Sequence, residues 1–72
     1  MAKSNALHHG LIHLYRNGNL VHKIRFFVHI DGTISGFDER MLSLGTFEDW
    51  GSFMIALNDN FQAEIHIMAV ND

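Results

Sequence analysis

The chain contains no cysteine and no proline, and only 18% of its residues are charged. Without cysteine it forms neither disulfides nor thiolate metal sites, and a reducing compartment suits such a chain. No apolar run reaches the ~20 residues of a transmembrane helix. Residues 1–5 lack the apolar segment of a signal peptide. We therefore expect a cytoplasmic protein without membrane contact.

Apolar residues, by contrast, make up 47% of the 72 residues. A domain of this size buries only ~60% of the surface that its unfolded chain exposes, and small domains often gain stability by oligomerisation. The apolar share is large for a lone domain, which suggests that a partner covers part of the apolar surface. We expect residues 1–72 to form a single domain, because they contain no linker and no repeat.

The charges are separated along the sequence. Residues 1–30 contain four cations and no carboxylate, whereas residues 31–72 contain one cation and all eight carboxylates. The net charge of −3 therefore combines a basic half with an acidic half. Either the two halves neutralise each other, within one chain or between chains, or the basic half faces a charged partner.

Two apolar segments, residues 7–15 and 20–30, flank Asn17-Gly18. An Asn-Gly pair in this setting predicts a β-hairpin, because a type I′ turn needs a positive φ at both central residues. Asp31-Gly32 is a second turn signal, so a third strand is expected to start near Thr33. Either it continues through Met41–Leu44, or Gly36 bulges or breaks it.

A helix is predicted after Thr46, which can act as N-cap, with Glu48 and Asp49 in the first turn. Apolar residues then recur at helical spacing at Phe47, Trp50, Met54 and Leu57. Residues 61–70 alternate between apolar and polar, as a half-buried strand does. The order β-β-β-α-β predicts an α+β fold, a small antiparallel sheet with one helix packed on one face. The last strand is expected to run parallel to the first.

A two-residue turn at Asn17-Gly18 pairs Tyr15 with Leu20 and His13 with His22, whereas a turn with a G1 bulge would shift this pairing. In this register, the face that the helix cannot cover carries Ile12, Leu14, Arg16, Val21, Lys23, Arg25 and Phe27. Apolar residues mixed with arginine are typical of interface cores. We expect this face, or an edge strand, to bind a second copy of the chain, and otherwise a different protein.

The chain is rich in histidine, with His8, His9, His13, His22, His29 and His66. His13 and His22 are predicted to lie across from each other with Cβ atoms ~5 Å apart. With His66 they are weak candidates for a zinc site, but no HExxH or similar motif supports one. We expect no metal and no cofactor. The histidines could also respond to pH, because their charge changes between about pH 5 and 8.

No motif predicts catalysis, since the chain has no cysteine nucleophile, no phosphate-binding loop and no G-x-S-x-G. We expect a non-catalytic, homodimeric protein-interaction domain that regulates or inhibits another macromolecule, as accessory proteins of phages and mobile elements do. The alternative is a single-stranded nucleic-acid-binding module, in which the basic strand face supplies cations and Phe27 a stacking ring. The negative net charge and the shortage of exposed aromatic residues count against it.

Overall fold

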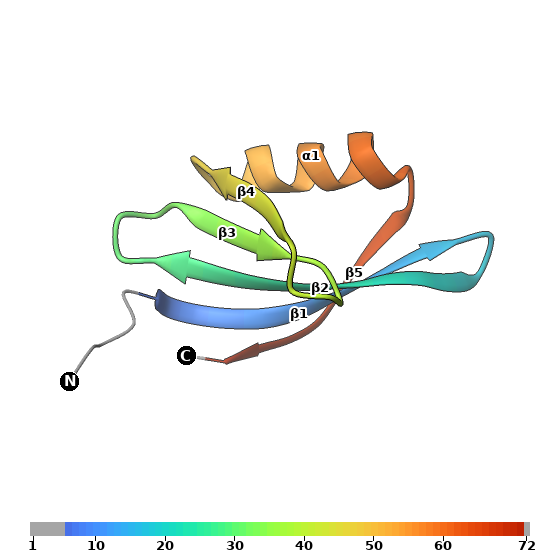
Figure 1. Ribbon diagram of the computed structural model, residues 1–72, viewed down its shortest axis with the longest axis horizontal. Helices are drawn as coiled ribbons and strands as arrows, with labels where there is room; N and C mark the ends of the chain where they lie inside the picture. Colours follow the sequence, from blue (N-terminus) through green and yellow to red (C-terminus); the bar gives the residue numbers. More distant parts are fainter. Residues whose placement is uncertain (1–5, 72) are drawn as a thin grey trace.

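The computed structural model describes residues 6–71, which form one antiparallel sheet and a helix that lies across it (Figure 1). The elements are β1 (Ala6–Arg16), β2 (Asn19–His29), β3 (Ile34–Phe37), β4 (Ser43–Phe47), α1 (Trp50–Phe61) and β5 (Glu64–Asn71). The predicted α+β class, with one helix packed on one face of a small antiparallel sheet, is confirmed. The expected lack of a signal peptide, and the charges of Lys3 and Asp72, fall outside the described residues.

The sheet has the order β4-β3-β2-β1-β5, and every neighbouring pair is antiparallel. The segment from Thr33 to Leu44 was expected to be one strand, but it turns after Phe37 and returns as β4. The Asp38 carboxylate holds this turn by accepting the backbone N–H groups of Arg40 and Leu42, each at 2.9 Å. The additional strand reverses the chain direction once more. For that reason β5 runs antiparallel to β1, and the expected parallel direction is wrong.

The β1–β2 hairpin turns at Asn17-Gly18, where both residues have a positive φ, as predicted. Tyr15 lies opposite Leu20, also as predicted. A β-bulge follows immediately, so that Leu14 pairs with His22, and His13 lies opposite Lys23 instead of His22. A shift of one residue in the pairing turns the side chains of one strand to the opposite face of the sheet relative to those of its partner. The side chains of β1 that were predicted to be covered by the helix are therefore on the uncovered face, and the others are covered.

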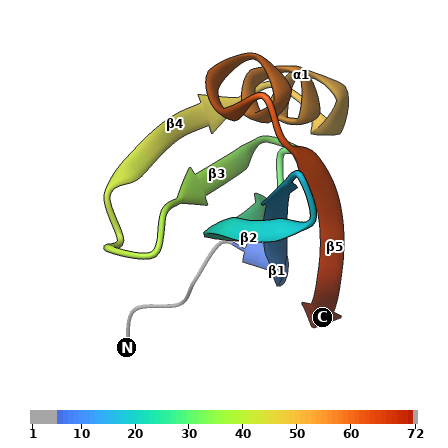
Figure 2. The same cartoon turned by 90° about the vertical axis from the view of Figure 1, so that its right-hand side faces the viewer.

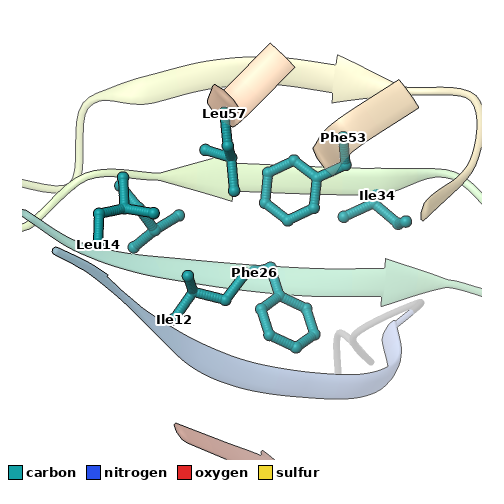
Figure 3. Packing of buried hydrophobic residues seen from close by; sticks show 7 residues of the cluster. Ile12, Leu14, Phe26, Ile34, Phe53 and Leu57 are labelled. Atoms are coloured by element: carbon teal, nitrogen blue, oxygen red, sulfur yellow. The ribbon is translucent and has the colours of Figure 1, made fainter. Parts of the chain in front are cut away.

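The core lies between the sheet and the inner side of α1 (Figure 3). Its fully buried side chains are Ile12, Leu14, Ile24, Phe26, Ile34, Phe53 and Leu57. Phe53 and Leu57 are one helical turn apart and point from α1 towards the strands. Ile12 and Leu14 are 0% exposed. Their predicted place on the uncovered face is therefore wrong, and the β-bulge is the reason.

Helix α1 begins three residues later than predicted. Its N-cap is Asp49, whose carboxylate accepts the backbone N–H of Ser52 at 2.8 Å, and this bond lowers the pKa of Asp49. Thr46, the predicted cap, instead lies in β4 opposite Ser35. The helix ends at Phe61, so β5 starts at Glu64 and not at residue 61. Within residues 6–71, no helix has the length and apolar character needed to span a bilayer.

Candidate interaction surfaces

Strand β5 forms one edge of the sheet and pairs with β1 along one side only. Seven of its eight residues are exposed. Among them are Ile67, Met68 and Val70, which are 51%, 51% and 54% exposed. Proteins often protect an edge strand with lysine or proline, and β5 contains neither. A long, apolar edge of this kind is suited to pairing with another strand.

The apolar surface continues from β5 onto the helix. Ile55 of α1 is 63% exposed and borders a shallow groove that also includes Met54, Ala63 and Ile65. Ile67 follows Ile65 on the same face of β5, because it lies opposite the buried Ile12. We call Ile55, Ile67, Met68 and Val70 the edge patch. It holds four of the eight large apolar residues that are exposed within residues 6–71.

The opposite edge of the sheet differs from β5. Strand β4 has five residues, against eight in β5, and includes Gly45 with φ of 114°. Each edge strand has one register shift in its pairing with the neighbouring strand, so length distinguishes the two edges. Its two large apolar side chains, Leu44 and Phe47, are only partly exposed and pack against the core. A short, irregular edge is a poor template for a second strand.

The face of the sheet turned away from α1 is convex, because the sheet curves around the helix (Figure 2). We call it the open face. The strand registers place on it Lys23, Arg25, Phe27 and His29 from β2, with His9, Leu11, His13 and Tyr15 from β1 and Phe37 from β3. Lys23 and Arg25 are exposed, and neither forms an ion pair with a carboxylate of residues 6–71.

Aromatic rings lie beside these cations. The His9 ring stacks on Phe27 with ring centroids 6.2 Å apart, and Phe27 meets Phe37 edge-on at 5.8 Å. On the β1–β5 side, the Tyr15 and His66 rings are 4.8 Å apart. A shallow depression lies between β2, β1 and β5, lined among others by His9, Leu11, Arg25, Phe27, Ala69 and Asn71. The open face thus combines positive charge with planar rings.

The carboxylates are concentrated elsewhere. Of those in residues 6–71, Glu64 alone lies in a strand, where its Oε1 is 3.1 Å from His66 Nε2. The others lie in turns or around α1. Glu39, for example, lies 3.2 Å from His22 Nδ1, and this hydrogen bond lowers the pKa of Glu39. Six of the seven carboxylates of residues 6–71 thus lie off the strands, whereas Glu64 lies on the open face, because it is opposite Tyr15.

The residues predicted to bind a partner are divided among three environments. Ile12 and Leu14 belong to the core, and Val21, at the β-bulge, packs against it. Arg16 is exposed, but its guanidinium donates to the backbone carbonyls of Phe61 and Gln62 and so holds the end of α1 on the hairpin. The structure brings three of the seven together on the open face: Lys23, Arg25 and Phe27.

The predicted histidine cluster does not form. His13 lies opposite His66 on the open face, whereas His22 is on the other face, with its ring 4.7 Å from that of Phe61. The sheet therefore separates His22 from the other two candidates. Across the described part of the chain, no three His, Asp or Glu side chains are positioned to hold a metal ion.

Comparison of the chain with models of protein families, with curated proteins and with solved structures finds no significant match. The edge patch and the open face are therefore the two surfaces from which a function is inferred. They differ in chemistry, since one is apolar with unpaired backbone groups and the other is cationic with aromatic rings.

Proposed function

We propose that this chain is a small, non-catalytic protein-interaction domain that acts as a homodimer joined through β5. The observation that carries the proposal is the eight-residue, unprotected edge strand with its exposed Ile67, Met68 and Val70. An edge strand presents a row of unpaired N–H and C=O groups, which another strand can satisfy by extending the sheet.

A second copy of the chain is the partner that this edge fits best. Two identical strands related by a two-fold axis pair antiparallel, so each presents to the other the same pattern of backbone groups and side chains. Residues 65–70 of one copy, which are apolar except for His66, would then meet residues 65–70 of the other. The pairing would also supply the stability that a domain of this size has difficulty in obtaining alone.

The helix contributes to the same interface. Specific interfaces bury in total ~1,200–2,000 Å², so apolar side chains beside the strand have to be buried along with its backbone. Ile55 and the groove that contains Ile65 extend the apolar surface from β5 onto α1. Pairing through β5 would cover these residues and would leave the open face of each copy accessible. We propose that this remaining surface serves the regulatory or inhibitory binding of another macromolecule.

The proposal is tested by Ile67→Lys, which places a charge in the middle of the edge patch. The wild-type chain should have twice the mass of one chain when measured by light scattering over a wide concentration range. Burying an unpaired lysine at the interface should weaken the dimer about a hundredfold or more. The variant should therefore be monomeric where the wild type is dimeric.

The matched control is Ile30→Lys, because Ile30 is 67% exposed but lies at the end of the β2 strand, away from β5. This variant should remain a dimer. A wild-type chain that stays monomeric at the highest concentration would refute the proposal. The same holds if Ile30→Lys separates the copies as completely as Ile67→Lys does.

A further inference from the structure

The open face has the charge that an anionic partner requires. Lys23 and Arg25 are successive residues on this face of β2, ~7 Å apart along the strand. Neither cation is neutralised by a carboxylate of residues 6–71. Six of the seven carboxylates of residues 6–71 lie in turns or around α1, and Glu64, beside Tyr15 on the open face, is hydrogen-bonded to His66. The part of the open face around Lys23 and Arg25 is therefore positive, although the chain has a net charge of −3.

The planar rings narrow the choice of anion. Phe27 is the next residue on the same face after Arg25, and it carries the His9 ring on one side and the edge contact with Phe37 on the other. Arg25, Phe27 and His9 line one depression, with Asn71 at its border. An acidic peptide would use the cations, but it would use the rings only where it also carries aromatic or apolar side chains. A single-stranded nucleic acid uses both, because phosphates bind cations and unpaired bases stack on aromatic faces.

The sequence indicated one aromatic residue, Phe27, on this face, and the structure adds more rings, of which His9 is exposed while Tyr15, Phe27 and Phe37 are half-buried. The β-bulge turns His9 and Tyr15 of β1 to the same face as Phe27, and β3 adds Phe37. The rings are therefore distributed over three neighbouring strands.

We propose that the open face binds single-stranded nucleic acid, with phosphates on Lys23 and Arg25 and bases stacked on the rings around Phe27. A duplex is a poorer ligand, because its bases are already stacked on one another and leave the protein rings unused. The site is separate from the edge patch. A chain made monomeric by Ile67→Lys should still bind, which distinguishes failure of this inference from failure of the proposed homodimer.

The test measures the fluorescence anisotropy of labelled single-stranded oligothymidine and oligoadenosine, and of a duplex of the same length, at low and raised salt. The wild type should bind the single strands more tightly than the duplex. Two phosphate contacts predict a slope of about −1.4 in a plot of log affinity against log salt concentration. No binding of either single strand at low salt would overturn the inference, and so would equal affinity for the duplex.

Charge reversal locates the site. Arg25→Glu should weaken binding at least about tenfold and make its salt dependence shallower. The matched control is Arg40→Glu, which makes the same change of charge at an exposed arginine in the β3–β4 turn and should have a much smaller effect. Equal losses in the two variants would show a general effect of charge and would contradict the proposed site.

Stacking is tested separately at Phe27. Phe27→Leu should weaken binding between about fivefold and a hundredfold, whereas Phe27→Tyr, which keeps a ring, should retain it. If Phe27→Leu binds as the wild type does, the rings have no part in recognition and the inference fails. It also fails if Arg25→Glu dissociates the dimer, because the open face would then hold a second copy of the chain.

Discussion

The two faces of the sheet have different compositions. The face beneath α1 is mostly apolar, and its residues Ile12, Leu14, Ile24, Phe26 and Ile34 are fully buried together with Phe53 and Leu57. The open face carries Lys23, Arg25 and several half-exposed rings. Burial of apolar side chains is the main source of stability, so the covered face stabilises the fold. The residues of the open face are consequently less constrained by the packing of the core.

The difference between the faces explains how so small a domain can present functional groups. A helix of 12 residues covers one face only. On the other face the cations remain hydrated, and their stems and the neighbouring rings cover the strands. This division predicts that substitutions of similar size will have very different effects on the two faces.

The largest effect is expected at Phe53, which is 0% exposed and contacts Phe26, Phe47 and Trp50. Phe53→Ala should reduce the free energy of unfolding by about 3–5 kcal/mol, through lost burial and the cavity left behind. Phe37→Ala on the open face should cost about 1 kcal/mol, mainly its edge contact with Phe27. Urea denaturation followed by Trp50 fluorescence measures both. Should Phe53→Ala fail to fold, Phe53→Leu is the milder substitution to compare.

Equal losses in the free energy of unfolding for Phe53→Ala and Phe37→Ala would contradict this difference between the two faces, because the open face would then contribute as much stability as the core.

A smaller loss is expected at Gly10, which lies on the covered side where β1 pairs with β5. A Cβ added there would approach Phe26 Cζ to 2.5 Å and would be even closer to the carbonyl oxygen of Ala69. Because one of these atoms belongs to the backbone, β5 has to shift, and Gly10→Ala should cost about 1–3 kcal/mol. It should also weaken the dimer if β5 forms the interface.

Gly51→Ala is the control for Gly10→Ala. Gly51 is in the first turn of α1, and an added Cβ would meet only Asp49 Oδ1 at an ordinary 3.6 Å. This substitution should increase the free energy of unfolding by about 0.5–1 kcal/mol, because alanine favours a helix more than glycine does. Thermal or urea unfolding measures the change in stability of both variants. If Gly10→Ala stabilises the chain as Gly51→Ala does, the packing at Gly10 is not tight.

The smallest effect is expected in the dependence of stability on acid pH. Hydrogen bonds in the folded chain lower the pKa values of Asp31, Glu39 and Asp49 below their usual values of 3.8, 4.5 and 3.8. The unfolded chain therefore binds more protons, and the stabilisation is fully present above about pH 5 and is lost as the pH falls through the lowered values. All three carboxylates lie in turns or at the start of α1.

Asp49→Asn sharpens this last prediction, since asparagine is also a good N-cap but does not titrate. At neutral pH the variant should be about as stable as the wild type. Between about pH 5 and 3 its free energy of unfolding should fall less steeply than that of the wild type, because one titrating group is missing. A slope unchanged from the wild type, measured by urea denaturation at each pH, would show that the cap does not contribute.

Most of the secondary structure could be predicted from local patterns. The Asn17-Gly18 turn, both long strands and the helix follow from turn chemistry and apolar spacing. The division of β3 from β4 was missed, although Asp38 gives a signal: a side chain that accepts backbone N–H groups two and four residues ahead favours a turn. The single missed strand then reversed the predicted direction of β5.

The candidate sites were harder to predict, because they depend on register. Side chains of β1 point alternately to the two faces of the sheet, and this alternation does not show which set is buried. The pairing with β2 decides it, and one additional residue of β2, Val21, shifts that pairing. For this reason Ile12 and Leu14 were predicted to be exposed, and His9 and Tyr15 were not expected beside Phe27. Lys23, Arg25 and Phe27 were predicted correctly to share the uncovered face, because β2 kept its predicted orientation.

The sequence by itself determined that this chain forms a sheet with one helix, that its apolar content is high and that its charges are segregated. Those properties are local or compositional, and they need no knowledge of which strands meet. The tertiary structure alone decided that β5 is an edge strand, paired with β1 on one side only, and that cations and rings share the convex face. The physical reason is that edges and faces arise from pairing between distant segments, and a β-bulge of one residue is enough to exchange what is buried and what is exposed.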